Sequence, residues 1–124
     1  MMNPEIKQKW IDALATATYK QGKGCLRNQK DEFCGLGVLC DIYSKETGVE
    51  WTPSDKDIEG VIEDGMEIEG RMATLPKEIM EWAGLESFNP VVNIESLGMC
   101  PLTHVNDSLN YTFPQIAELI QEQL

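Results

Sequence analysis

A group of basic residues surrounds two glycines near the start of the chain, in the segment YKQGKGCLRN (residues 19–28). Gly22 and Gly24 let backbone N–H groups turn toward an anion, and neighbouring lysines add positive charge, a combination typical of phosphate-binding loops. Arg27 is one of two arginines and suits a bidentate hold on phosphate or carboxylate. The residues that we expect to contact an anionic ligand here are Lys20, Gln21, Gly22, Lys23, Gly24 and Arg27.

The glycine loop matches neither of the common nucleotide motifs. It lacks the six-residue spacing and the Lys-Ser/Thr pair of a Walker A loop. It does not follow a strand, as a dinucleotide fingerprint would. The alternative is that it ends a helix and leads into a hairpin. A second polar stretch, residues 104–108, reads as a loop before the last helix, where Asn106 and Asp107 are either further ligand contacts or an Asx-turn.

Four cysteines and one histidine offer thiol or metal chemistry. Cys34 lies near an expected helix N-terminus, where a thiolate is stabilised, and His104 and Asp107 could serve as its base and orienting group. The spacings around Cys34, Cys40, Cys100 and His104 match no common zinc finger or ribbon. The favoured interpretation makes Cys34 and Cys40 small, reduced core residues. The sequence therefore predicts no catalytic residue, no metal ligand and no cofactor, and a thiol or metal enzyme ranks third among the functions considered.

The 124 residues carry a formal net charge of −11 that is unevenly distributed. Residues 1–49 sum to +1, residues 50–86 to −8, and residues 87–124, which contain no Lys or Arg, to −4. Such a surface repels nucleic acid but can attract a basic protein, and solubility alone would also explain it. No apolar run approaches the roughly 18 residues that span a bilayer, and the first residues lack a signal-peptide core. We expect a cytoplasmic protein with no membrane partner.

The pattern of caps and apolar spacing predicts a single α+β domain over residues 1–124, with about four helices packed on a small, mostly antiparallel sheet. Asn3 and Pro4 begin the first helix, and Thr112 with Gln115 forms a capping box for the last. The expected helices span 3–19, 33–46, 74–84 and 112–124, with strands at 25–27 and 90–94. Residues 50–73 form an acidic, hairpin-like segment, in which Asp64-Gly65 predicts a turn between VIE and MEIE.

Most of the chain outside this acidic segment resembles a group of small, uncharacterised proteins of tailed bacteriophages. Their first motif, Tyr-x-Gln-Gly-x-Gly-x-Leu-Arg, is matched by Tyr19, Gln21, Gly22, Gly24, Leu26 and Arg27. Their second, Phe-Cys-Cys-Leu-Gly-Val-Leu-Cys-Asp, is matched by Phe33, Cys34, Leu36, Gly37, Val38, Leu39, Cys40 and Asp41. Gly35 stands where the group has a second cysteine, which argues against an obligatory metal or disulfide role there. The segments LPKEIMEWAGL and LTHVNDSLNYTFPQIAELI extend the resemblance, which implies action in the cytoplasm of a bacterial host.

These observations favour a non-enzymatic phage accessory protein that binds a small phosphorylated or nucleotide ligand, such as a signal of bacterial immunity that it sequesters. The alternative is an acidic inhibitor that binds a host defence or replication protein through residues 50–69. The partners expected are thus a small anion or a host protein. The oligomeric state is left open.

Overall fold

The computed structural model describes residues 2–16, 18–28, 30–53 and 66–124, and the backbone of 57–58 and 61–62. Five α-helices lie in this part of the chain: α1 (Pro4–Ala15), α2 (Gly35–Thr47), α3 (Lys77–Ala83), α4 (Leu102–Asp107) and α5 (Phe113–Gln123). Four strand pairs accompany them: β1 (Lys20–Gln21) with β2 (Glu32–Phe33), β3 (Thr52–Pro53) with β6 (Met66–Glu67), β4 (Asp57–Ile58) with β5 (Val61–Ile62), and β7 (Val91–Ile94) with β8 (Gly98–Pro101). The mixture of helices and small sheets confirms the α+β class.

Helix α1 begins as expected but ends earlier than residue 19. The side chain of Asn3 accepts hydrogen bonds from the N–H groups of Glu5 and Ile6, and a proline occupies the first turn. The hydroxyl of Thr16 donates to the Asp12 carbonyl, 2.8 Å away. The helix ends at Ala15, with a last bond from the Thr16 N–H to the same carbonyl, and β1 begins at Lys20, five positions later.

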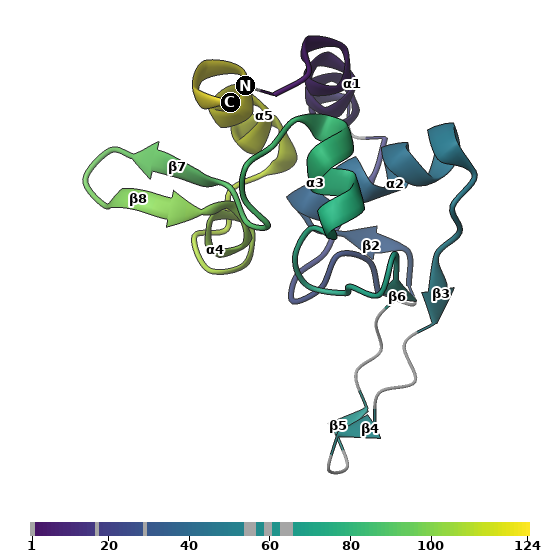
Figure 1. Cartoon of the computed structure of the whole chain (residues 1–124). Helices are drawn as coiled ribbons and strands as arrows, with labels where there is room; N and C mark the ends of the chain where they lie inside the picture. The colour runs from purple at the N-terminus through teal and green to yellow at the C-terminus, as the bar shows by residue number, and fades with distance from the viewer. Residues whose placement is uncertain (1, 17, 29, 54–56, 59–60, 63–65) are drawn as a thin grey trace.

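Helix α2 lies at the centre of the fold, between α1 and α4 (Figure 1). It starts at Gly35 because Phe33 belongs to β2 and the Cys34 sulfur caps the helix by accepting from the Gly37 N–H. A Cβ atom on Gly37 would lie 1.7 Å from the Leu26 carbonyl oxygen, so the glycine allows the close approach of another backbone. The left-handed Gly48, with φ of 81°, ends the helix.

The acidic segment pairs differently from the sequence prediction. Asp64-Gly65 and Glu63 lie outside the described residues, but the expected pairing of VIE with MEIE is wrong. Strand β5 pairs with β4, and β6 pairs with β3, both antiparallel. The N–H of Met66 donates to the Arg27 carbonyl at 2.8 Å, which holds β6 against the basic segment.

Strand pairing is mostly antiparallel, as expected, since of the four described pairs only β1–β2 is parallel. Two local predictions near the candidate site needed correction. The strand expected at 25–27 is reduced to one bridge between Arg27 and Phe33. The polar loop expected at 104–108 is helix α4 with its C-cap, because Leu102 and Val105 lie one turn apart and are both buried.

One apolar core unites these elements, with buried side chains from all five helices, from β7 and β8, and from Leu26 and Leu75 in connecting segments. Helices α1 and α5 pack side by side, so the two ends of the chain lie close together (Figure 1). The hairpin of β7 and β8 extends away from this body (Figure 1). None of the described helices is both long and apolar enough to cross a bilayer.

Candidate ligand-binding groove

The glycine loop is fastened to α4 by side-chain amides. Gln21 Nε2 donates to Asn106 Oδ1 at 2.9 Å and to the Tyr111 carbonyl at 2.7 Å. Asn106 Nδ2 in turn donates to the Gly22 carbonyl at 2.9 Å. The structure thus brings residues 21–24 and 106–107 together across more than eighty positions, and it buries Asn106 almost completely.

The cationic and N–H groups of this loop have partners within the protein. Asp107 accepts from the Gly24 N–H at 3.2 Å and from Asn106 Nδ2 at 2.7 Å. The Lys23 ammonium donates to the side-chain oxygen of Asn110. The protein's own carboxylate therefore occupies the position at which the loop would present an N–H group to an external anion. We call the contacts of Gln21, Gly22 and Gly24 with Asn106 and Asp107 the loop clamp.

The two glycines have different reasons to be there. A Cβ atom on Gly22 would lie 2.7 Å from Glu32 Cβ, so this position needs a close approach to β2. Gly24 has open space around it but adopts φ of 86°, which other residues rarely tolerate. Both therefore serve the shape of the loop.

Arg27 faces a different place, an open groove of about 620 Å³ bounded by the basic segment, α2 and the start of the acidic segment. The side chains that line it come from residues far apart in sequence, and three of them are aromatic and three cationic. They are Thr18, Tyr19, Lys20, Arg27, Asp31, Phe33, Asp41, Ser44, Lys45 and Trp51.

An aromatic wall supports the arginine. The Phe33 ring packs edge-on against Tyr19 and Trp51, with centroid distances of 5.0 and 6.2 Å. The Arg27 guanidinium lies over the Phe33 ring at 5.2 Å and over the Trp51 ring at 5.6 Å. These contacts hold the guanidinium against the rings, and its N–H edge suits a planar, anionic group.

Asp41 fixes the opposite side of the groove. Its buried carboxylate accepts from the Tyr19 hydroxyl at 2.7 Å and from Trp51 Nε1 at 3.1 Å, and it pairs with Lys45 at 3.2 Å. Burial, reinforced by Asp41, raises the pKa of Tyr19, and hydrogen bonds to Tyr19 and Asp41 raise the pKa of Lys45. At neutral pH the groove therefore keeps a neutral phenol and a charged ammonium.

Each groove cation also has a carboxylate partner, and two of these pairs lie near solvent. Asp31 Oδ1 accepts from Arg27 at 2.6 Å and 3.1 Å, and Lys20 lies 3.5 Å from Glu32. The Asp31 side chain is 71% exposed, whereas that of Arg27 is 23% exposed. An exposed carboxylate forms a weak pair that a better anion can displace. Asp31 therefore accepts from the N–H groups of Arg27 in an ion pair that contributes little free energy.

The structure separates the predicted site residues into two sets. Lys20 and Arg27 line the groove, whereas Gln21, Gly22, Lys23, Gly24, Asn106 and Asp107 form or flank the loop clamp. Sequence reasoning missed Tyr19, Asp41, Lys45 and Trp51 as groove residues. The i,i+4 spacing of Asp41 and Lys45 on a helix could have predicted their ion pair. No pattern in the neighbouring sequence predicts that Trp51 contacts Asp41.

None of the four cysteines, all of them described, forms a disulfide, and Cys34, Cys40 and Cys100 are buried, which confirms the expected core position of the first two. Burial raises the pKa of the Cys34 thiol to about 12, so the helix N-terminus does not yield a thiolate there. Within the described ranges, no three His, Cys, Asp or Glu side chains come close enough to share a metal ion.

A family model described as a domain of unknown function (DUF8296) matches residues 2–124. Comparisons with curated proteins and with solved structures found no match for the chain. The match extends over the loop clamp, the groove and the β7–β8 hairpin alike.

Proposed function

The chain belongs to the DUF8296 family, and we propose that it is a non-enzymatic accessory protein of a tailed bacteriophage that binds a small phosphorylated ligand, such as a nucleotide, in the groove. The phage setting rests on the sequence resemblance. The binding site rests on the side chains of the groove. In this proposal the protein acts in the host cytoplasm by sequestering its ligand.

The observation that carries the proposal is the Arg27 guanidinium, stacked on Phe33 and Trp51 in the groove wall. Arginine held in this way presents two parallel N–H groups, which match the oxygens of a phosphate better than a lysine does. Lys20 and Lys45 at the rim of the same groove add charge on either side. Three cations in one groove stand out in a chain with a net charge of −11.

The aromatic wall favours a ligand that also has a flat, apolar part. Nucleobases stack on aromatic side chains without requiring a particular sequence of hydrogen bonds. A groove of about 620 Å³ falls within the usual range of small-molecule sites. The ligand's phosphate would replace the Asp31 carboxylate on Arg27, and its base would lie against the rings.

Isothermal titration calorimetry against a panel of mononucleotides, cyclic nucleotides and inorganic phosphate tests the proposal. We expect one nucleotide class to bind the wild type, and Arg27→Gln to weaken its binding by about 10-fold or more, since a hydrogen bond to a charged group contributes about 1.5–3 kcal/mol. Lys77→Gln on α3 is the matched control, because it removes an exposed positive charge away from the groove. Equal binding by the wild type and Arg27→Gln would contradict the groove, and no binding by any panel member would contradict the function.

A further inference from the structure

The large apolar side chains that remain exposed in the described part of the chain all lie between residues 88 and 99. They are Phe88, Val91, Leu97 and Met99, with exposed fractions from 44% to 63%. The Arg71 guanidinium covers the Phe88 ring at 5.4 Å, which leaves Val91, Leu97 and Met99 on the β7–β8 hairpin. We call these three residues the hairpin patch.

The strand register places two members of the hairpin patch on one face. Val91 pairs with Pro101, and Asn93 pairs with Met99, so these four residues share the outer face of the hairpin. Val92, Ile94 and Cys100 occupy the opposite face and are buried. Leu97 lies in the connecting turn, where its N–H donates to the Ile94 carbonyl at 3.0 Å. One face of the hairpin therefore packs against the core, and the other face is exposed to solvent.

The two edges of the hairpin also differ. At β7, Gln123 Oε1 accepts from the Asn93 N–H at 2.6 Å, and Gln123 Nε2 donates to the Asn93 carbonyl at 3.0 Å. Because both groups of Asn93 point away from β8, those of its partner Met99 point away from β7. Pro101 occupies the next such position of β8 and has no N–H to offer. A short edge that carries a proline is protected against the addition of a further strand, so the outer face is the part of the hairpin open to a partner.

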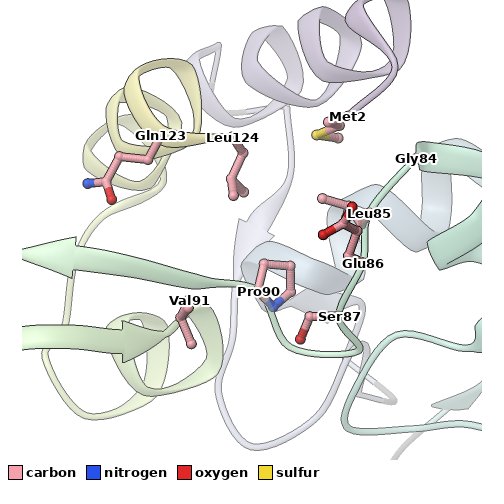
Figure 2. Close-up of a pocket in the computed structure, with 9 residues that line it drawn as sticks. All are labelled: Met2, Gly84, Leu85, Glu86, Ser87, Pro90, Val91, Gln123 and Leu124. Atoms are coloured by element: carbon pink, nitrogen blue, oxygen red, sulfur yellow. The ribbon is translucent and has the colours of Figure 1, made fainter.

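An apolar hollow of about 250 Å³ continues from Val91 toward the body of the protein. Figure 2 shows Leu85 and Pro90, from the connection between α3 and β7, and Leu124, which follows α5, around it, with Met2 nearby. A cavity of roughly 150 Å³ is enough to hold a benzene ring. The hollow therefore has room for one apolar side chain of a partner that lies along the hairpin.

The charges around the hairpin patch are acidic. Glu86 lines the hollow, Glu95 lies in the hairpin, and Glu122 precedes the residue that caps β7. All three are exposed, and residues 87–124 contain no Lys or Arg. A second copy of this chain would bring like charges together, since each copy carries −11, whereas a basic partner would be attracted.

We infer that the hairpin patch docks a basic protein segment in extended conformation, which lies across the outer face of the hairpin, inserts an apolar side chain into the hollow and places Lys or Arg beside the glutamates. Burial of the patch gives affinity in this mode, and the side-chain pocket gives specificity. The inference is independent of the nucleotide proposal, because the groove and the hairpin have no lining residue in common.

Selection from a random library of displayed 12-residue peptides, with the wild-type protein as bait, tests this docking surface. We expect the enriched peptides to contain an apolar residue flanked by Lys or Arg. A synthetic copy of the most enriched peptide is then titrated by fluorescence anisotropy. We expect Leu97→Ser/Met99→Ser to weaken its binding at least 10-fold and Glu95→Gln to weaken it several-fold, with a further loss as salt rises.

Two controls keep the result interpretable. Glu118→Gln removes the same charge from the exposed side of α5 and should leave peptide binding unchanged. Met99→Lys alone places a charge in the hairpin patch, and it replaces the double variant if that variant does not fold. Enrichment of no common pattern, or equal binding by the Met99 variants, would overturn the inference. Sedimentation of the wild type as a dimer that Met99→Lys dissociates would assign the surface to a second copy instead.

Discussion

The loop clamp and the groove arise from one basic segment of sequence but use their polar groups differently. In the loop clamp, the Gln21 amide donates to Asn106, the Gly24 N–H donates to Asp107, and Asn106 is 1% exposed. In the groove, Arg27 pairs with a carboxylate that is largely in water. One basic, glycine-rich segment therefore has a structural part, the loop clamp, and a part whose partner can be exchanged, Arg27. The two differ in the burial of the partner: Asn106 is buried, whereas Asp31 is exposed.

The largest effect should come from Gly37→Ala, which disturbs the support that both regions share. The new Cβ would lie 1.7 Å from the Leu26 carbonyl oxygen, a backbone atom that cannot move aside. We expect a loss of about 3 kcal/mol or more in the free energy of unfolding, measured by urea denaturation. Gly35→Ala on the same helix is the control, because its Cβ would meet Ile116 at an ordinary 3.6 Å. Equal stability of the two variants would mean that Leu26 does not pack as described.

Asn106→Ala should break the loop clamp but leave the groove unchanged. It removes a buried amide and leaves Gln21 Nε2 and the Gly22 carbonyl without a partner at that point. We expect a loss of about 1–3 kcal/mol in stability, seen as a lower denaturation midpoint. Any ligand of Arg27 should bind this variant as it binds the wild type at temperatures where the variant is folded. Loss of ligand affinity at full folding would place the binding site on the loop clamp.

The decline of the free energy of unfolding at alkaline pH should depend on Cys34, which caps α2. Burial raises the pKa of this thiol to about 12 from an ordinary value of 9.0, so the folded state holds a proton that the unfolded state releases. The stabilisation is complete below pH 9 and is lost as the pH rises from 9 toward 12, by up to about 1.4 kcal/mol per pH unit.

Urea denaturation at pH 8, 9.5 and 10.5 measures this dependence on pH. Cys34→Ala should be less stable at pH 8 but should show a shallower decline. Native Cys34 should also resist iodoacetamide at pH 8, and rapid labelling of Cys34 in the folded protein would contradict its burial.

Asp31→Asn should have the smallest effect and should sharpen the difference between the two regions. It removes the exposed carboxylate that competes for Arg27, so ligand affinity should rise up to about 5-fold, since such pairs contribute at most about 1 kcal/mol. Stability should change little for the same reason. Asp12→Asn on α1 is the comparison for the change in charge, with no expected gain in affinity. Weaker ligand binding by Asp31→Asn would mean that Asp31 contacts the ligand.

The sequence predicted the helix ends that are formed by hydrogen bonds between residues close together in the chain. The capping box of Thr112 and Gln115 is present in α5, and Gly84 ends α3 with φ of 76°. After it, the Leu85 N–H donates to the Met80 carbonyl, as a Schellman-type end requires. These features depend on residues three to six positions apart, which a single sequence displays.

The elements that were missed depend on distant partners. Helix α4 has six residues and no side-chain cap, and it is held by burial of Leu102 and Val105 against the core. The parallel strands β1 and β2 have two residues each, too few for a periodic pattern. The groove joins Tyr19, Phe33 and Trp51 from three segments, so its aromatic wall exists only once the chain is folded.

Leu26 fastens the basic segment at its middle, although it belongs to no helix or strand. Its N–H donates to the Met72 carbonyl at 2.7 Å, and its own carbonyl accepts from the Cys34 N–H at 3.2 Å. The side chain is fully buried. Opening of the chain on one side of Leu26 therefore need not spread to the other, and the two sides can fluctuate on separate timescales. In a hydrogen-exchange experiment the Leu26 amide should exchange as slowly as those of α2, between faster neighbours on both sides.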